Sequence, residues 1–231
     1  MSAPSDHKNT VIKFATVSYT SKRQAIIEEL ERDLDAHMRL QNPKRFAHSI
    51  SVGHMAETMA VAYGIDPYPA RVAGILHDWE KGLSNEDTLL LAEKYQLEMG
   101  VAYVKIISLL HGPLAARELP KLYPWLSEEI LSAIAKHTTA DLVMSDLDKI
   151  IYVADLIEPL RASYPSIVRS RELFVRHVSL EALYRASFTS TLLYVVESGK
   201  YLYPKSVDIY NAMIGCPLKE TEPDVTKRTE R

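Results

Sequence analysis

Residues 67–81 read PYPARVAGILHDWEK, an apolar segment that ends in adjacent polar side chains. Asp66-Pro67 is typical of an N-cap followed by the first helical residue, and the apolar spacing predicts a helix that runs to Lys81. Because burying a polar group without a partner is unfavourable, His77 and Asp78 need a common partner. Imidazole and carboxylate are both good ligands for first-row metal ions. Neighbouring helical residues lie about 100° apart, so both side chains can reach one centre, and Asp78 has two oxygens with which to bridge two ions.

The same helix signals recur along the rest of the chain. Ser21 with Gln24 predicts a capping box for the first helix, and Asn42-Pro43 starts a second helix that ends near Gly64. Further helices are expected from Ser84, at about 100–110, 112–122 and 127–137, from Ser145, and at about 179–198 and 206–214. Only the stretch 11–19 offers an alternative as a strand. The sequence therefore predicts an all-α fold, with one compact domain over 22–215, a flexible lead-in over 1–21 and a tail over 216–231.

Composition excludes several classes of protein. Of 231 residues, 47% are hydrophobic and 25% are charged, which are ordinary values for a globular domain. The charge sum of 27 − 30 = −3 leaves no basic excess for binding nucleic acid. A single cysteine, Cys216, fits a reducing compartment. Neither a membrane-spanning run nor a signal-peptide pattern is recognisable, so we expect a cytoplasmic protein without membrane contact.

Four more residues of types that bind metal ions fall on separate predicted helical segments: His48, His111, His137 and Asp155. Each has a simpler interpretation. A histidine on an apolar helix is more often a core residue bonded to a carbonyl, His137 could complement a helix dipole, and Asp155 could pair with Arg161 or Lys149. The ordered set of six residues favours a shared metal centre over six separate coincidences.

At these positions the sequence resembles the HD-domain phosphohydrolases, and within them the YqeK family. His48, His77-Asp78 and Asp155 match the His…His-Asp…Asp motif, and His111 and His137 match the two histidines that two-metal members add. The narrower resemblance covers about residues 22–214 and rests on the words RFAHS (45–49), LHDWEK (76–81), HGP (111–113), HTT (137–139), ADLIEPLR (154–161) and a final helix over 203–211. The chain departs from the family's pattern at Trp79, Glu80, Ala140 and Leu160, none of which is a candidate ligand.

The resemblance implies a symmetrical diadenosine tetraphosphatase, which splits Ap4A into two ADP molecules with iron. One ion would be held by His48, His77, Asp78 and Asp155, and the other by Asp78, His111 and His137. Such mixed ligation suits Fe, Mn or Co better than Mg, and a hydroxide bridging the two ions would attack phosphorus.

The polyphosphate requires cations near the metal ligands. The catalytic candidates are Asp78, Lys81 and Arg45, and the candidate substrate contacts are Arg45, Lys81 and Arg161. The expected partner is a small dinucleoside polyphosphate.

Other functions stay open from sequence. The same site could act on a nucleoside monophosphate or a cyclic nucleotide. A regulatory HD module would bind metal and nucleotide without turnover, and a helical interaction domain with buried histidines would bind no metal. The apolar faces of the C-terminal helices also leave a homodimer as an alternative.

Overall fold

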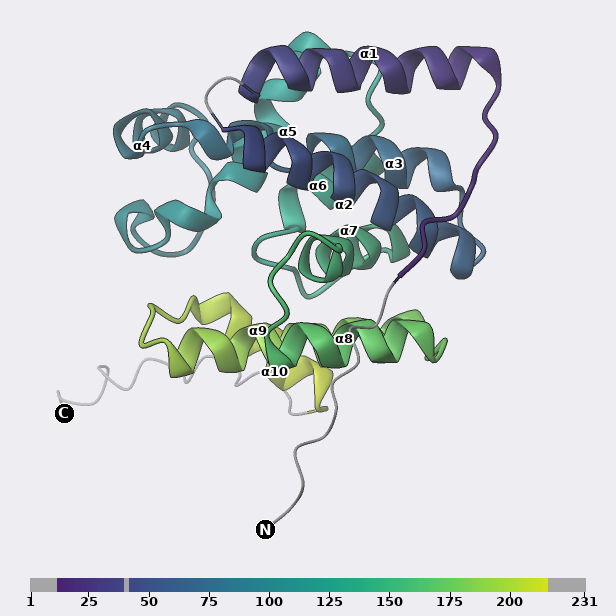
Figure 1. The fold of residues 1–231 in the computed structure, drawn as a ribbon. Coiled ribbons are helices and arrows are strands. Elements are labelled where there is room, and N and C mark those ends of the chain that lie inside the picture. The colour runs from purple at the N-terminus through teal and green to yellow at the C-terminus, as the bar shows by residue number, and fades with distance from the viewer. Residues whose placement is uncertain (1–11, 40–41, 216–231) are drawn as a thin grey trace, which may run out of the picture.

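The computed structural model describes residues 12–39 and 42–215, and within them every regular element is a helix (Figure 1). This confirms the all-α prediction. The elements are α1 (Ser21–Met38), α2 (Pro43–Ala62), α3 (Pro67–Leu76), η1 (Trp79–Gly82), α4 (Asn85–Lys94), η2 (Tyr103–Lys105), η3 (Ile107–Leu109), α5 (His111–Leu122), α6 (Glu128–Lys136), α7 (Asp146–Ile157), α8 (Pro165–Val175), α9 (Leu180–Glu197) and α10 (Pro204–Met213). No helix in this part of the chain is both long and apolar enough to cross a membrane.

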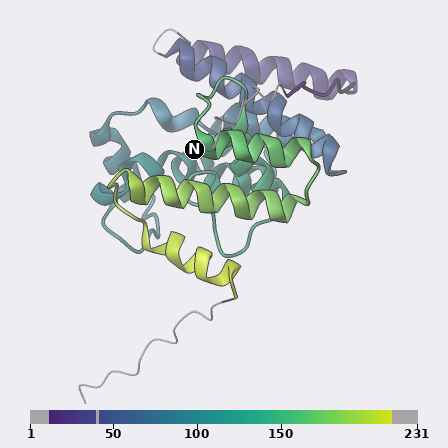
Figure 2. The ribbon, with the colours of Figure 1, turned by 60° about the horizontal axis from the view of Figure 1, so that its bottom comes forward.

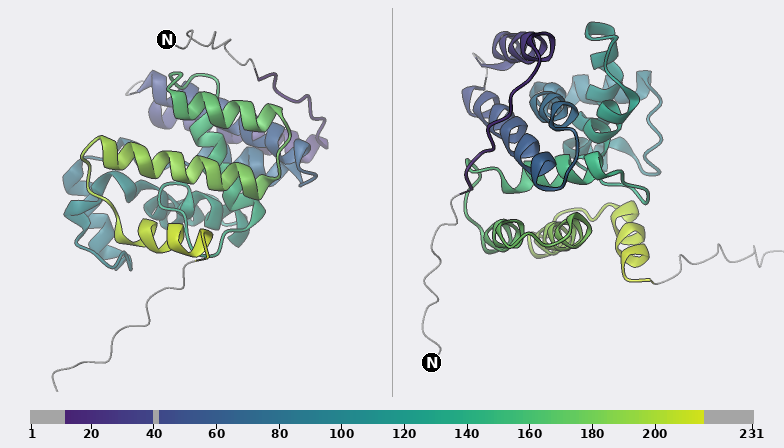
Figure 3. Two further views of the ribbon diagram at one scale, coloured as in Figure 1. Left: turned by 90° about the horizontal axis from the view of Figure 1, so that it is seen from below. Right: turned by 90° about the vertical axis from the view of Figure 1, so that its right-hand side faces the viewer.

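The helices pack in layers around α7. In Figure 1, α1 lies above the pair α2 and α3, and α8 and α9 lie below α7. Figure 2 shows α8 and α9 side by side, and both views of Figure 3 show α10 at the edge of their layer. The largest cluster of buried apolar side chains joins α1, α2, α3, α6, α7 and α9. A smaller one joins α4, α5 and the 103–110 segment through Tyr203.

Side-chain caps start the helices largely where the sequence indicates. Asn42, Asp66, Ser84 and Ser145 each accept a hydrogen bond from a backbone N–H of the first turn. Ser145 and Asp148 form the full capping box expected of the pattern. The first helix differs, because Thr20 is its N-cap and Ser21 is already helical.

Two expectations about helix extent are wrong, and one helix was not expected. The α3 helix ends at Leu76, and Lys81 lies in the 3-10 turn η1, where its N–H bonds the Asp78 carbonyl three residues earlier. Residues 100–110 form two short 3-10 turns instead of a helix. The α8 helix was not predicted, because its buried side includes Ser170 and Arg171, which break the apolar period.

Residues 12–20 form no strand and lie in extended conformation on α2. The Ala15 N–H donates to Thr58 Oγ1 at 2.9 Å, and the Phe14 ring stacks on His54 with 5.2 Å between ring centroids. Tyr19 donates to the carboxylate of Glu57. These contacts differ from the flexible lead-in expected up to residue 21. Residues 1–11 and the expected tail 216–231 lie outside the described residues.

Two glycines let α2 and α3 approach closely. A Cβ on Gly74 would lie 2.7 Å from Gly53 Cα and 3.0 Å from the Val52 carbonyl oxygen. Both obstacles are backbone atoms, which cannot rotate away. The closeness matters for function, because α2 carries His48 and α3 leads directly into His77.

We expect Gly74→Ala to lower the free energy of unfolding by about 1–3 kcal/mol, as overpacked cores do. Gly82→Ala is the matched control, because a Cβ there meets nothing within 4 Å. Urea unfolding followed by circular dichroism measures both variants. Equal stability of the two variants would contradict the close-packing explanation.

Candidate metal centre

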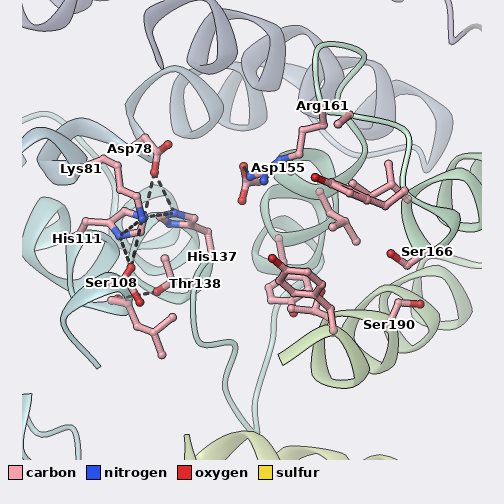
Figure 4. A pocket seen from close by; sticks show the side chains of 18 of the residues that line it. Asp78, Lys81, Ser108, His111, His137, Thr138, Asp155, Arg161, Ser166 and Ser190 are labelled. Carbon is pink, nitrogen blue, oxygen red and sulfur yellow. Dashed lines mark hydrogen bonds and ion pairs between the residues drawn. The ribbon is translucent and has the colours of Figure 1, made fainter. Parts of the chain in front are cut away.

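The six predicted ligand residues come together from five parts of the chain. His48 lies in α2, His77 and Asp78 follow α3, His111 begins α5, His137 follows α6, and Asp155 lies in α7. All except Asp155 are buried, and Asp155 is partly exposed. Figure 4 shows Asp78, His111, His137 and Asp155 facing one cavity.

All four histidines direct the same ring nitrogen outward, away from the centre. In three of them Nδ1 contacts the carbonyl oxygen three residues earlier: His77 and Gly74 at 2.7 Å, His111 and Ser108 at 3.0 Å, and His137 and Ile134 at 2.7 Å. The Nδ1 of His48 instead lies 2.9 Å from Glu158 Oε1. In a neutral ring, such an acceptor favours the proton on Nδ1, which leaves Nε2 as the ligand atom that faces the centre.

The two oxygens of Asp78 face different histidines. Oδ1 lies 2.9 Å from His111 Nε2 and 3.6 Å from His137 Nε2. Oδ2 lies 3.5 Å from His77 Nε2 and 3.7 Å from His48 Nε2. The carboxylate therefore stands between two pairs of imidazoles.

Asp155 completes the group around His48 and His77. Its Oδ1 lies 2.9 Å from His48 Nε2 and 3.6 Å from His77 Nε2. Two groups of possible ligands are each compact enough to hold one ion, because the ligand atoms within a group lie no more than 4.8 Å apart. The first group is His48, His77 and Asp155, and the second is His77, Asp78 and His137.

These residues fit a transition-metal ion on chemical grounds. Among the described residues, the fully buried Nε2 atoms of His48 and His77 have no hydrogen-bond partner, so the 2.9 Å approach of His48 to Asp155 is not itself a hydrogen bond. The Nε2 atoms of His111 and His137 lie 3.1 Å apart. With their protons on Nδ1, these two nitrogens would face each other as acceptors. Bound metal ions would supply the partners that these four Nε2 atoms lack.

The site holds its carboxylates ionised. Burial would raise the pKa of Asp78, but the surrounding imidazoles, His77 foremost and then His111 and His137, hold that pKa well below its usual range. Burial opposes a charge on His77 as well, yet Asp78 and Asp155 outweigh it and raise the pKa of His77 to about 10. Burial lowers the pKa of His111 to about 4, which favours the neutral ring.

The three predicted cations border the same cavity of about 590 Å³. Arg45 NH1 lies 2.6 Å from Asp78 Oδ2, and Arg161 NH2 contacts Asp155 Oδ1 at 2.5 Å. Lys81 Nζ lies 3.2 Å from the Ser108 carbonyl oxygen, and burial lowers its pKa. The alternative partner of Asp155, Lys149, pairs with Glu181 instead.

Sequence reasoning missed Glu158, which contacts His48. Glu158 belongs to the segment ADLIEPLR (154–161), three residues after Asp155, but the sequence alone does not indicate a role for this second carboxylate. The side chain of Glu158 is almost completely buried, and its Oε2 accepts the Leu160 N–H at 2.6 Å.

Comparisons with known proteins agree with this arrangement. The HD domain family model matches residues 45–160. Proteins named symmetrical bis(5'-nucleosyl)-tetraphosphatase from Halalkalibacterium halodurans and Staphylococcus aureus are each 32% identical to this chain, over 74% and 73% of its length and 89% and 86% of theirs. A crystal structure from Clostridium acetobutylicum, described as an HD superfamily hydrolase involved in NAD metabolism, superposes with a TM-score of 0.73 at 30% identity, covering 81% of this chain and 96% of that one.

The matched region of the family model contains all six metal-ligand candidates. With that model matching half of the sequence, and with relatives aligned over most of their length, this chain belongs to the HD-domain family of hydrolases, alongside the proteins named symmetrical bis(5'-nucleosyl)-tetraphosphatase.

Proposed function

We propose that this chain hydrolyses diadenosine tetraphosphate at its central bridge and releases two ADP molecules. The observation that carries the proposal is the position of Asp78, whose two oxygens face different histidine pairs inside a cavity bordered by cations. The names of the Halalkalibacterium and Staphylococcus relatives support the choice of substrate.

The donor set suits two ions of iron, manganese or cobalt. His48, His77, Asp155 and Asp78 Oδ2 would hold one, and His111, His137 and Asp78 Oδ1 the other. When bound, such ions lower the pKa of water and neutralise charge on phosphate oxygens. Imidazole nitrogens make magnesium a poorer fit.

The cationic residues would bind and orient the tetraphosphate. Arg45 pairs with Asp78, and Arg161 pairs with Asp155. Lys81 lies beside His111, with 3.2 Å between Nζ and Nδ1. A guanidinium can hold two phosphate oxygens, whereas the ammonium of Lys81 acts as a point charge. In the reaction a water oxygen would bond one of the two central phosphorus atoms and the bond from that phosphorus to the bridging oxygen would break. The bridging oxygen would leave with the other ADP, and the protons of the water would pass to solvent.

Glu158 would position His48 for metal binding. Burial would raise the pKa of Glu158, but hydrogen bonds from His48 and Ser51 lower that pKa, so it stays an ionised acceptor. Arg171 fixes the backbone here, since its NH2 donates to the Glu158 carbonyl at 2.6 Å. Carboxylate partners of this kind set the orientation and basicity of histidine ligands.

We expect protein purified without oxygen to contain about two transition-metal ions per chain and to convert diadenosine tetraphosphate to ADP alone. Elemental analysis and product chromatography measure the two properties. AMP plus ATP as products would reject central cleavage, and metal without turnover would redirect the proposal to another phosphoester or to a regulatory module.

The matched variants for this experiment are Asp78→Asn and Asp146→Asn. Asp78→Asn should lose metal and turnover together, because the amide is a weak ligand and cannot serve both histidine groups. Asp146 is exposed at the start of α7, so its variant should keep both. Full turnover by Asp78→Asn would show that the site is wrongly assigned.

Lys81→Ala should raise KM for diadenosine tetraphosphate by about tenfold, which corresponds to roughly 1.4 kcal/mol of a charge-assisted contact, and leave the metal content unchanged. Steady-state kinetics with elemental analysis test this, with Lys94→Ala in α4 as the control. A loss of metal in Lys81→Ala would mean that this lysine supports the site's structure instead.

Glu158→Gln should weaken metal binding by about 10–100-fold and reduce the metal content toward one ion per chain, because His48 belongs to only one histidine group. Chelator competition gives the affinity. Glu57→Gln is the control, since Glu57 is also buried but bonds Tyr19 away from the cavity. Equal metal affinity in Glu158→Gln and the unaltered protein would remove this role.

A further inference from the structure

A second cavity of about 370 Å³ opens beside the metal centre and is not used by the proposed mechanism. It shares a wall with the first cavity, made of Ser108, Leu109, Thr138, Tyr152, Thr191 and Tyr194. From this wall it extends along the end of α9 to the segment 200–203 that leads into α10. The two cavities therefore adjoin along this wall.

The second cavity adjoins one side of the catalytic centre. Ser108 accepts from Lys81 and contacts His111, and Thr138 follows His137 directly. Figure 4 shows Ser108 and Thr138 beside His111 and His137, with Ser166 and Ser190 across the first cavity from them. A molecule centred on Asp78 can thus extend in two directions, toward Tyr164 and Ser166 or into the second cavity.

The chemistry of the second cavity fits a nucleoside attached to phosphate. The residues Tyr194 and Tyr201 are 50% and 45% exposed. Each has a lysine beside its face, with Lys200 Nζ 4.7 Å from the Tyr194 centroid and Lys105 Nζ 5.6 Å from the Tyr201 centroid. Among the described residues that line this cavity, none carries a carboxylate. Exposed aromatic faces stack on nucleobases, and ammonium groups attract phosphate.

We infer that the second cavity binds the second nucleoside of the dinucleoside substrate, with Tyr201 as its stacking surface and Lys105 beside the adjoining phosphate. The inference rests on the proposed function, because a substrate with a nucleoside at each end can occupy both cavities at once. A nucleoside on each side of the centre is the arrangement that central cleavage requires.

The test compares Tyr201→Ala with the unaltered holoenzyme, using diadenosine tetraphosphate as substrate and adenosine 5'-tetraphosphate as competitive inhibitor. Tyr201→Ala should raise KM for the dinucleotide by about tenfold, the loss expected for one stacked base, with kcat nearly unchanged. The inhibition constant of the mononucleotide should change by no more than about twofold, because its one nucleoside can still occupy the other direction. Lys105→Ala should also raise KM for the dinucleotide, because Lys105 lies beside the phosphate that adjoins the second nucleoside.

Trp125→Ala is the control, since Trp125 is 46% exposed and lines neither cavity. It should change neither constant. Equal effects of Tyr201→Ala on both ligands, or no effect on either, would overturn the second subsite while leaving the proposed function intact. If the unaltered holoenzyme does not cleave diadenosine tetraphosphate, the proposed function fails and the subsite fails with it.

Discussion

The carboxylate of Asp78 is the point on which the site depends, because it lies among four imidazoles and one guanidinium in the protein interior. An ionised carboxylate buried alone would be strongly unfavourable, and here each oxygen is compensated by a different set of neighbours. The helices that supply those neighbours must therefore converge on one residue. The close crossing of α2 and α3 at Gly53 and Gly74 is one means by which they do so.

Helix ends provide the fixed geometry of the histidines. His77 and His137 each follow the last residue of a helix and bond a carbonyl of its final turn, where carbonyls lack partners within the helix. The helix end thus orients the ring, and the ring satisfies a carbonyl that burial would otherwise leave unpaired. His48 lies within α2, where the carbonyls are already bonded, and so it takes its acceptor from Glu158 in a distant segment.

The sequence was sufficient to predict the all-α class, most helix starts and the convergence of all six ligand candidates, because caps and ordered motifs are local signals. It was insufficient for α8, whose buried polar residues obscure the helical period, and for residues 12–20, whose contacts with α2 are tertiary. Glu158 was missed for a related reason. Its partner, His48, lies 110 residues earlier in the chain, and the sequence does not reveal a contact that only the fold creates. The second cavity also has no linear signature, since its wall combines the 105–109 segment with α9 and residues 200–203.

The long separation between His48 and its carboxylate partners affects how the protein is made. Asp155 and Glu158 follow His48 by more than one hundred residues, and both belong to the end of the region that the family model matches. A chain synthesised only through His137, the residue after α6, has the four candidate-ligand histidines but lacks these two carboxylates. All six candidate ligands can come together only after α7 has left the ribosome and docked, so a metal centre built from them would form late in synthesis, when α8, α9 and α10 alone remain to be added.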